Sequence, residues 1–174
     1  MDDHIIVETS DNLKTKVLRN VAIQSITFRD LITDVTGDVE ISLKKCESFI
    51  SKKTFEKCIE FIEKSIEDPI KENADSDFDS ESKYIYNDWA LKFCDNIPFK
   101  ELEELAELAN YIDIKPLLDL ITTKYANDIN KTKTLDEIRD IFGVKNDFDP
   151  EDYATYIHQC DWCLENCDKI PIKK

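Results

Sequence analysis

The chain has 174 residues, with 23 lysines and arginines against 38 aspartates and glutamates, which gives a formal net charge of −15. This acidic balance disfavours binding to nucleic acid or to an anionic membrane surface, so proteins are the expected partners. The length suits one domain with a sizeable core, and we identify neither a signal peptide nor an apolar run long enough to cross a membrane.

Three short strands are predicted before the helical bulk of the chain. Residues 4–9 and 13–18 carry β-branched side chains and flank a turn-forming triplet at residues 10–12, which indicates a β-hairpin. Alternating polarity at residues 39–43 predicts the third strand.

Helices are predicted between and after these strands. Residues 20–25 and 26–32 indicate two short helices, with Ser25 as the N-cap of the second. Residues 51–64 form an amphipathic pattern. Its apolar stripe consists of Phe55, Cys58, Ile59 and Ile62.

An acidic stretch follows at residues 67–83. It holds seven acids against two lysines and few apolar side chains, so it buries too little surface to offset its ordering entropy. We interpret it as a disordered linker, a solvated spacer in preference to a specific binding tail.

Beyond the linker the sequence predicts helices at residues 84–95, 102–112 and 117–129. The apolar side chains of residues 102–112 recur at three- and four-residue steps, with glutamates on the other faces. Pro116 predicts a break before the next helix, because proline lacks an N–H and disfavours helical angles in the residue before it. Two helices are therefore expected to meet at residues 110–115.

The C-terminal part has its own helix signals. Thr134 and Glu137 have the spacing of a capping box, and Gly143 suits the left-handed residue that ends a helix. Asp149 and Pro150 predict the N-cap and first turn of a last helix, which is expected to run through Trp162 and Cys167.

Several of these segments resemble one known family. Residues 109–115, with the sequence ANYIDIK, together with residues 117–119 resemble the signature of the Skp adaptor family, which links F-box proteins to cullin in SCF ubiquitin ligases. The family's C-terminal signature is matched by residues 137–139 with Phe142, by residues 144–148, and by Trp162 with Cys163.

The resemblance implies an α/β (α+β) fold that is mostly helical. Residues 1–129 are expected to form a BTB/POZ-like domain with three short N-terminal strands and a disordered acidic loop at about 67–83. Residues 130–168 are expected to form a C-terminal helical extension that binds the F-box, and residues 169–174 a tail.

The resemblance also implies site residues. Asn110 and Tyr111 match positions that face the cullin. Five residues match positions in the apolar cradle that holds the F-box: Ile138, Phe142, Val144, Phe148 and Trp162. Apart from the resemblance, apolar residues at this spacing indicate intramolecular core. Tyr125 and Asp128 depart from the family pattern and are expected to reshape the cradle.

Cysteine chemistry is the alternative from another class. Cys160, Cys163 and Cys167 lie near His158, but the remaining cysteines form no second ligand pair for zinc and no signature flanks a nucleophile. We expect six reduced thiols in the cytoplasm and nucleus, no cofactor and no catalytic residue. A cysteine-based redox or metal protein stays open as a remote alternative.

The expected function is a non-catalytic adaptor that joins a cullin to F-box substrate receptors for protein ubiquitination. An F-box-binding adaptor in a cullin-free assembly is the closer alternative. A homodimer of the free protein is also considered, because an exposed apolar cradle permits self-association.

Overall fold

The protein is described from a computed structural model. Its described residues are 4–33, 35, 37, 39–46, 49–73, 83–95, 97–132, 134–147 and 149–159. The chain divides into two compact units, Met1–Ala126 and Asn127–Lys174. The boundary lies inside a long helix, three residues before the one expected from the sequence, and each unit is described by itself.

A three-stranded sheet with the order β2-β1-β3 opens the first unit. Strand β1 (His4–Glu8) pairs antiparallel with β2 (Lys14–Leu18) and parallel with β3 (Val39–Ser42). Ile5 and Val7 point to the buried face and have no exposed surface, as the period of two in a strand requires. The predicted hairpin and third strand are thereby confirmed.

The parallel crossover from β2 to β3 contains two short helices, α1 (Arg19–Ala22) and α2 (Ile26–Ile32). Ser25 caps α2 as predicted, because its side chain accepts a hydrogen bond from the Phe28 N–H. A 3-10 turn (Leu43–Lys45) follows β3 and precedes the helix that begins at Lys52.

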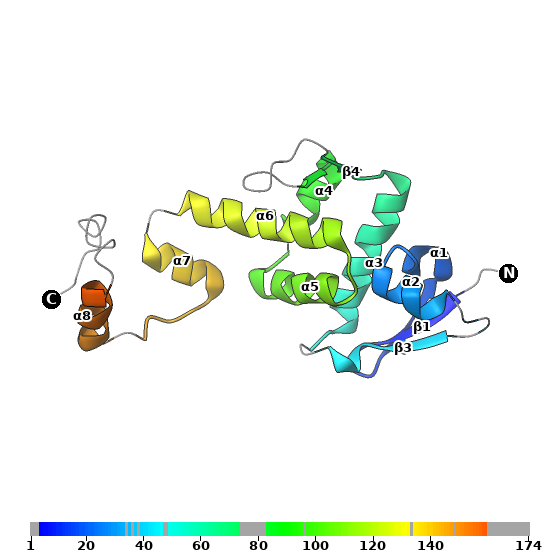
Figure 1. Ribbon diagram of the computed structural model, residues 1–174, viewed down its shortest axis with the longest axis horizontal. Helices are drawn as coiled ribbons and strands as arrows, with labels where there is room; N and C mark the ends of the chain where they lie inside the picture. Colours follow the sequence, from blue (N-terminus) through cyan, green and yellow to red (C-terminus); the bar gives the residue numbers. More distant parts are fainter. Residues whose placement is uncertain are drawn as a thin grey trace. The chain divides into compact units, whose positions relative to one another are not determined.

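Helix α3 (Lys52–Glu67) lies between the sheet and α5 (Phe99–Tyr111), and contacts β2, α1 and α5 (Figure 1). Its predicted stripe is largely buried. Phe55, Cys58 and Ile62 are at most 2% exposed, and Ile59 is half-buried. The core around this helix also takes in Phe28, Phe61, Leu105, Leu108, Ile112, Leu117 and Ile121.

The acidic segment differs from the expectation at both ends. Helix α3 continues to Glu67, and strand β4 (Lys71–Glu72) pairs antiparallel with β5 (Tyr84–Ile85). Ile70 also packs against the core. The linker prediction is therefore wrong for residues 67–73 and 83. The pairing of β4 with β5 and the packing of Ile70 order these residues, and composition does not reveal such contacts. Residues 74–82 lie outside the described residues.

The predicted helix at residues 84–95 is also wrong at its start. Tyr84 and Ile85 belong to β5, and helix α4 covers only Asp88–Phe93. Trp89 and Phe93 do lie one turn apart on α4, and both rings contact Phe61, with centroids 5.4 and 5.3 Å from its ring. Phe61 thus ties α3 to α4 through an aromatic cluster.

Helix α6 (Lys115–Lys131) crosses the boundary between the units. The second unit contains α7 (Leu135–Phe142) and α8 (Pro150–Gln159). The capping box of Thr134 and Glu137 and the left-handed Gly143, with φ of +62°, are confirmed at the two ends of α7. Asp149 accepts backbone N–H bonds at the start of α8, and the predicted continuation to Trp162 and Cys167 lies outside the described residues.

Candidate functional site

The end of α5 carries the first pair of predicted site residues. The Ile114 N–H donates to the Ala109 carbonyl at 2.8 Å, and the Asp113 N–H donates to the Asn110 carbonyl at 3.3 Å. Asp113 is left-handed, with φ of +55°. These three features form a Schellman motif, which fixes the helix end. Asn110 and Tyr111 are exposed in the last turn before it.

Two hydroxyl groups of the neighbouring segment hold this helix end in place. The Ser25 Oγ donates to the Ile112 carbonyl at 2.5 Å, and the Thr27 Oγ1 donates to the Tyr111 carbonyl at 3.2 Å. Ser25 is fully buried, so its bond is shielded from water. The backbone beside Asn110 and Tyr111 is therefore attached to the start of α2.

A groove of about 390 Å³ lies beside Tyr111, and we call it the Tyr111 groove. Its apolar side chains come from α2, β3 and the 3-10 turn. They are Phe28, Leu31, Val39, Ile41 and Leu43, joined by Thr27, Glu40, Ser42 and Lys45. Leu31 is 53% exposed and Tyr111 is 39% exposed, so two large apolar side chains border the groove.

Sequence reasoning missed the Tyr111 groove. It predicted the helix that carries Leu31 and the strand that carries Val39, but it did not connect either element with Tyr111. The only local signal is that Leu31 lies between two polar-rich stretches, and such a pattern equally fits a core residue. The contact depends on residues about 80 positions apart, as the bond between Thr27 and Tyr111 illustrates.

The second unit presents apolar side chains on α7. Leu135, Ile138 and Phe142 recur at three- and four-residue steps and so share one face, and Val144 follows the left-handed Gly143. We call these four residues the α7 apolar surface. Ile138 is half-buried, whereas the exposed fractions of Leu135, Phe142 and Val144 are 47%, 38% and 59%.

Phe148 and Trp162, the other two predicted cradle residues, lie outside the described residues. The two departures from the family pattern have different surroundings. The Tyr125 ring packs against Phe99 with centroids 5.0 Å apart, and burial raises the pKa of its hydroxyl to about 12. The Asp128 carboxylate pairs with the Lys131 ammonium at 3.2 Å. The added charge on α6 is therefore compensated within its own helix.

Two of the described cysteines have thiols that are less acidic than usual. Cys46, Cys58 and Cys94 are free, and burial raises the pKa of Cys58 to about 12 and that of Cys94 to about 11. Such thiols stay protonated at neutral pH and are poor nucleophiles. Among the described residues no group of His, Cys, Asp and Glu is arranged to hold a metal ion. The side chains of His158, Cys160, Cys163 and Cys167, which the sequence disfavours as a zinc site, lie outside the described ones.

None of the helices in the described ranges combines the length and the apolar composition needed to cross a membrane. The features that stand out are instead two surfaces with exposed apolar side chains, one in each unit. They belong to a small α/β protein with a mixed sheet and a core of packed helices, and exposed apolar surfaces are the usual contact sites for other proteins.

Comparison with known proteins gives the family. A model of the Skp1 family, dimerisation domain, matches residues 115–162. The chain is 32% identical over 158 residues to the SCF ubiquitin ligase complex protein SKP1b of Dictyostelium discoideum, covering 90% of this chain and 93% of that protein. It is 34% identical over 161 residues to SKP1-like protein 11 of Arabidopsis thaliana, with 92% and 97% covered.

A fungal relative agrees with these two. The E3 ubiquitin ligase complex SCF subunit sconC of Arthroderma benhamiae is 32% identical over 163 residues, with 92% of this chain and 95% of that protein covered. The chain therefore belongs to the Skp1 family. The family resemblance inferred from residues 109–119 and from the C-terminal signature is confirmed.

Proposed function

We propose that this chain is the adaptor subunit of an SCF-type ubiquitin ligase, which joins a cullin scaffold to F-box substrate receptors. The observation that carries the proposal is similarity over nearly the whole length to proteins named as SCF complex subunits in a social amoeba and a fungus. The adaptor has no bond chemistry of its own in this proposal. It acts by holding the substrate receptor near the ubiquitin-transfer machinery.

On the cullin side, the proposed contact residues are Asn110 and Tyr111 together with the Tyr111 groove. Support comes from the fixed geometry of the α5 end, since a Schellman motif and two hydroxyl groups remove most of its freedom before binding. A preformed surface loses less conformational entropy on association. Apolar side chains in the groove, with Leu31 half exposed, suit an apolar anchor from a partner helix.

On the F-box side, the proposed contacts are Ile138, Phe142 and Val144 of the α7 apolar surface, and Phe148 and Trp162 further along the chain. Exposed aromatic and aliphatic side chains carry much of the energy of protein interfaces. Arg139 lies one turn after Leu135, at the edge of the α7 apolar surface, and its guanidinium pairs with the Asp136 carboxylate at 2.9 Å. The charge at this edge is therefore compensated within the helix.

We further propose that the protein acts in the cytoplasm and nucleus, where reduced thiols such as those of Cys46, Cys58 and Cys94 persist. Cell fractionation of the tagged chain tests this part: recovery in a secretory compartment contradicts it.

Self-association of the free protein through the α7 apolar surface is also proposed, and sedimentation equilibrium with and without an F-box peptide tests it.

The adaptor role is tested by size-exclusion co-elution of the full chain with an F-box segment and a cullin N-terminal domain. Asn110→Lys/Tyr111→Lys is expected to abolish cullin co-elution and to retain the F-box. Phe142→Glu/Val144→Glu is expected to do the reverse. The matched controls are Glu103→Lys, exposed on α5, and Lys131→Glu, exposed at the end of α6. Each control changes the net charge as much as the corresponding double variant.

Three results are informative beyond the expected one. Equal loss of cullin binding with Glu103→Lys assigns the effect to charge and overturns the proposed contact at Tyr111. Binding of the wild type to the F-box but not to any cullin favours the cullin-free adaptor. Binding to neither partner contradicts the adaptor role altogether.

A further inference from the structure

A second cavity, of about 590 Å³, lies in the first unit where four segments meet. These segments are the start of α2, the C-terminal half of α3, the β4–β5 pair and the turn between α5 and α6. Its volume is in the range that holds small ligands or a few side chains. Within the described ranges it shares no lining residue with the Tyr111 groove, and the cullin and F-box contacts proposed above leave it unused.

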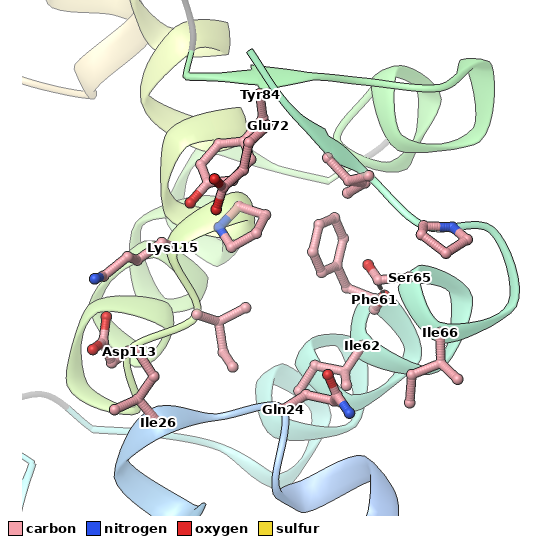
Figure 2. Close-up of a pocket in the computed structure, with 14 residues that line it drawn as sticks. Gln24, Ile26, Phe61, Ile62, Ser65, Ile66, Glu72, Tyr84, Asp113 and Lys115 are labelled. Carbon is pink, nitrogen blue, oxygen red and sulfur yellow. Dashed lines mark hydrogen bonds between the residues drawn. The ribbon is translucent and has the colours of Figure 1, made fainter. Parts of the chain in front are cut away.

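One side of this cavity is apolar. Phe61 and Ile62 of α3 form its buried base, and Figure 2 shows the Phe61 ring pointing into the space. Ile66, Ile70 and the ring of Pro69 continue this side toward solvent. Ile66 is 42% exposed, so the apolar wall is accessible to a partner. An aliphatic side chain fits such a wall without the cost of burying a polar group.

The other side is polar and carries a negative balance. Glu72 of β4 and Asp113 of the α5–α6 turn both line the cavity, and Lys115 is the one positively charged residue among the described residues of the lining (Figure 2). In the described part of the chain, neither carboxylate forms an ion pair or accepts a side-chain hydrogen bond. Two carboxylates without a cation partner favour a positively charged ligand.

Tyr84 lines the cavity and is affected by the same negative charges. It is the register partner of Glu72 in the β4–β5 pair, and several carboxylates lie near enough to act on its hydroxyl. Burial raises the pKa of Tyr84, and the negative charges of Glu72, Asp119 and Asp113 raise it further. A phenol ring beside carboxylates suits a guanidinium group, which stacks on aromatic faces and pairs with two oxygens at once.

We propose that this cavity is a docking site for a peptide segment of a protein partner that presents an arginine flanked by an aliphatic residue. The arginine lies between Glu72, Asp113 and the Tyr84 ring, and the aliphatic residue contacts Ile66 and Ile70. Charge complementarity decides for this occupant, since the two carboxylates outnumber the single ammonium of Lys115 among the described lining residues and a neutral or acidic segment leaves that negative balance in place. The site is independent of the SCF role, because no residue proposed to contact the cullin or the F-box takes part.

The test uses the ¹⁵N-labelled full chain at low salt and the probe peptide acetyl-Ala-Leu-Arg-Leu-Ala-amide. We expect saturable shifts of the amide signals around Glu72, Tyr84 and Asp113. Replacing arginine in the peptide by citrulline, its neutral isostere, tests the charge. Glu72→Gln and Asp113→Asn are each expected to weaken binding by about threefold, and Lys115→Gln to tighten it by about as much.

Two controls, Glu107→Gln and arginine amide, separate a specific site from general attraction to an acidic protein. Glu107→Gln removes an exposed charge of α5 that does not line the cavity and is expected to leave binding unchanged. Asp113→Asn keeps the fold, because asparagine tolerates the left-handed conformation of this residue. Arginine amide alone is expected to bind more weakly than the peptide, because it lacks the aliphatic contact.

Equal binding of the citrulline peptide overturns the proposal, and so does a Glu107→Gln effect as large as that of Glu72→Gln. The proposal also fails if the shifts lie on α7 or if arginine amide binds as tightly as the peptide. Absence of any saturable shift overturns it as well. None of these results bears on the SCF role, which the co-elution experiment decides.

Discussion

Ser25 is expected to be the side chain whose loss most directly loosens the α5 end. Its Oγ accepts the Phe28 N–H at 3.0 Å and donates to the Ile112 carbonyl at 2.5 Å, and both Ser25 and Ile112 are fully buried. Pro116, four residues beyond Ile112, has no N–H to offer this carbonyl. The hydroxyl therefore caps one helix and satisfies the end of another.

The size of the effect follows from these two bonds. Loss of the cap in Ser25→Ala costs about 1 kcal/mol, and a buried carbonyl left without a donor costs about 1–3 kcal/mol. We expect the free energy of unfolding to fall by about 2–4 kcal/mol. With a urea m-value of about 2 kcal/mol/M, the midpoint falls by about 1–2 M.

The assay is urea unfolding followed by the fluorescence of Trp89, in a Trp162→Phe background that leaves one tryptophan, in the first unit. Thr27→Ala is the matched control. It removes a hydroxyl bond from the same helix to the neighbouring Tyr111 carbonyl, but that bond is exposed and water replaces it. If Ser25→Ala shifts the midpoint as little as Thr27→Ala, the burial argument is refuted.

Three further predictions rest on other contacts. Asp11→Asn is expected to lower the free energy of unfolding by about 1 kcal/mol at pH 7, since the carboxylate accepts the Lys52 N–H at 2.9 Å and a hydrogen bond from the Thr9 hydroxyl. The Thr9 bond holds the pKa of Asp11 below its usual 3.8. The stability difference between wild type and Asp11→Asn is therefore present above pH 3.8 and is lost as pH falls through the lower pKa of the folded protein. Urea midpoints at pH 7 and pH 3 check it. Cys58 and Cys94, with pKa values raised by burial to about 12 and 11, are expected to escape brief alkylation at pH 8 that peptide mapping detects at Cys46. Thr134→Ala breaks the capping box and is expected to destabilise α7 by about 1 kcal/mol, seen as about fivefold faster amide hydrogen exchange in that helix.

Each of these has an outcome that contradicts it. A difference between Asp11→Asn and wild type that persists unchanged at pH 3 excludes the carboxylate as its source. Alkylation of Cys58 in the folded protein at the rate of Cys46 contradicts its burial. For α7 the control is Thr122→Ala, whose hydroxyl bonds to carbonyls of its own helix, and equal acceleration there removes the capping argument.

The sequence by itself determined the local elements and the family. Periodicity over a few turns predicted α3, α5 and α6, and the capping box and Gly143 predicted both ends of α7, because each signal acts between residues within a few positions of one another. The motif at residues 109–119 and the C-terminal signature together identified the family, since both patterns are read directly from the chain. The cullin and F-box roles of the individual residues stay predictions.

Only the tertiary structure decided which of these elements meet. The β4–β5 pair ordered part of a segment whose composition indicated disorder, because its partner strand lies beyond the acidic stretch. The bond from Ser25 to the Ile112 carbonyl joins residues 87 positions apart. The Tyr111 groove and the cavity lined by Glu72 and Asp113 each need four segments of the chain. Local pattern carries no information about such distant contacts, because they depend on how apolar faces pack together once the helices have formed.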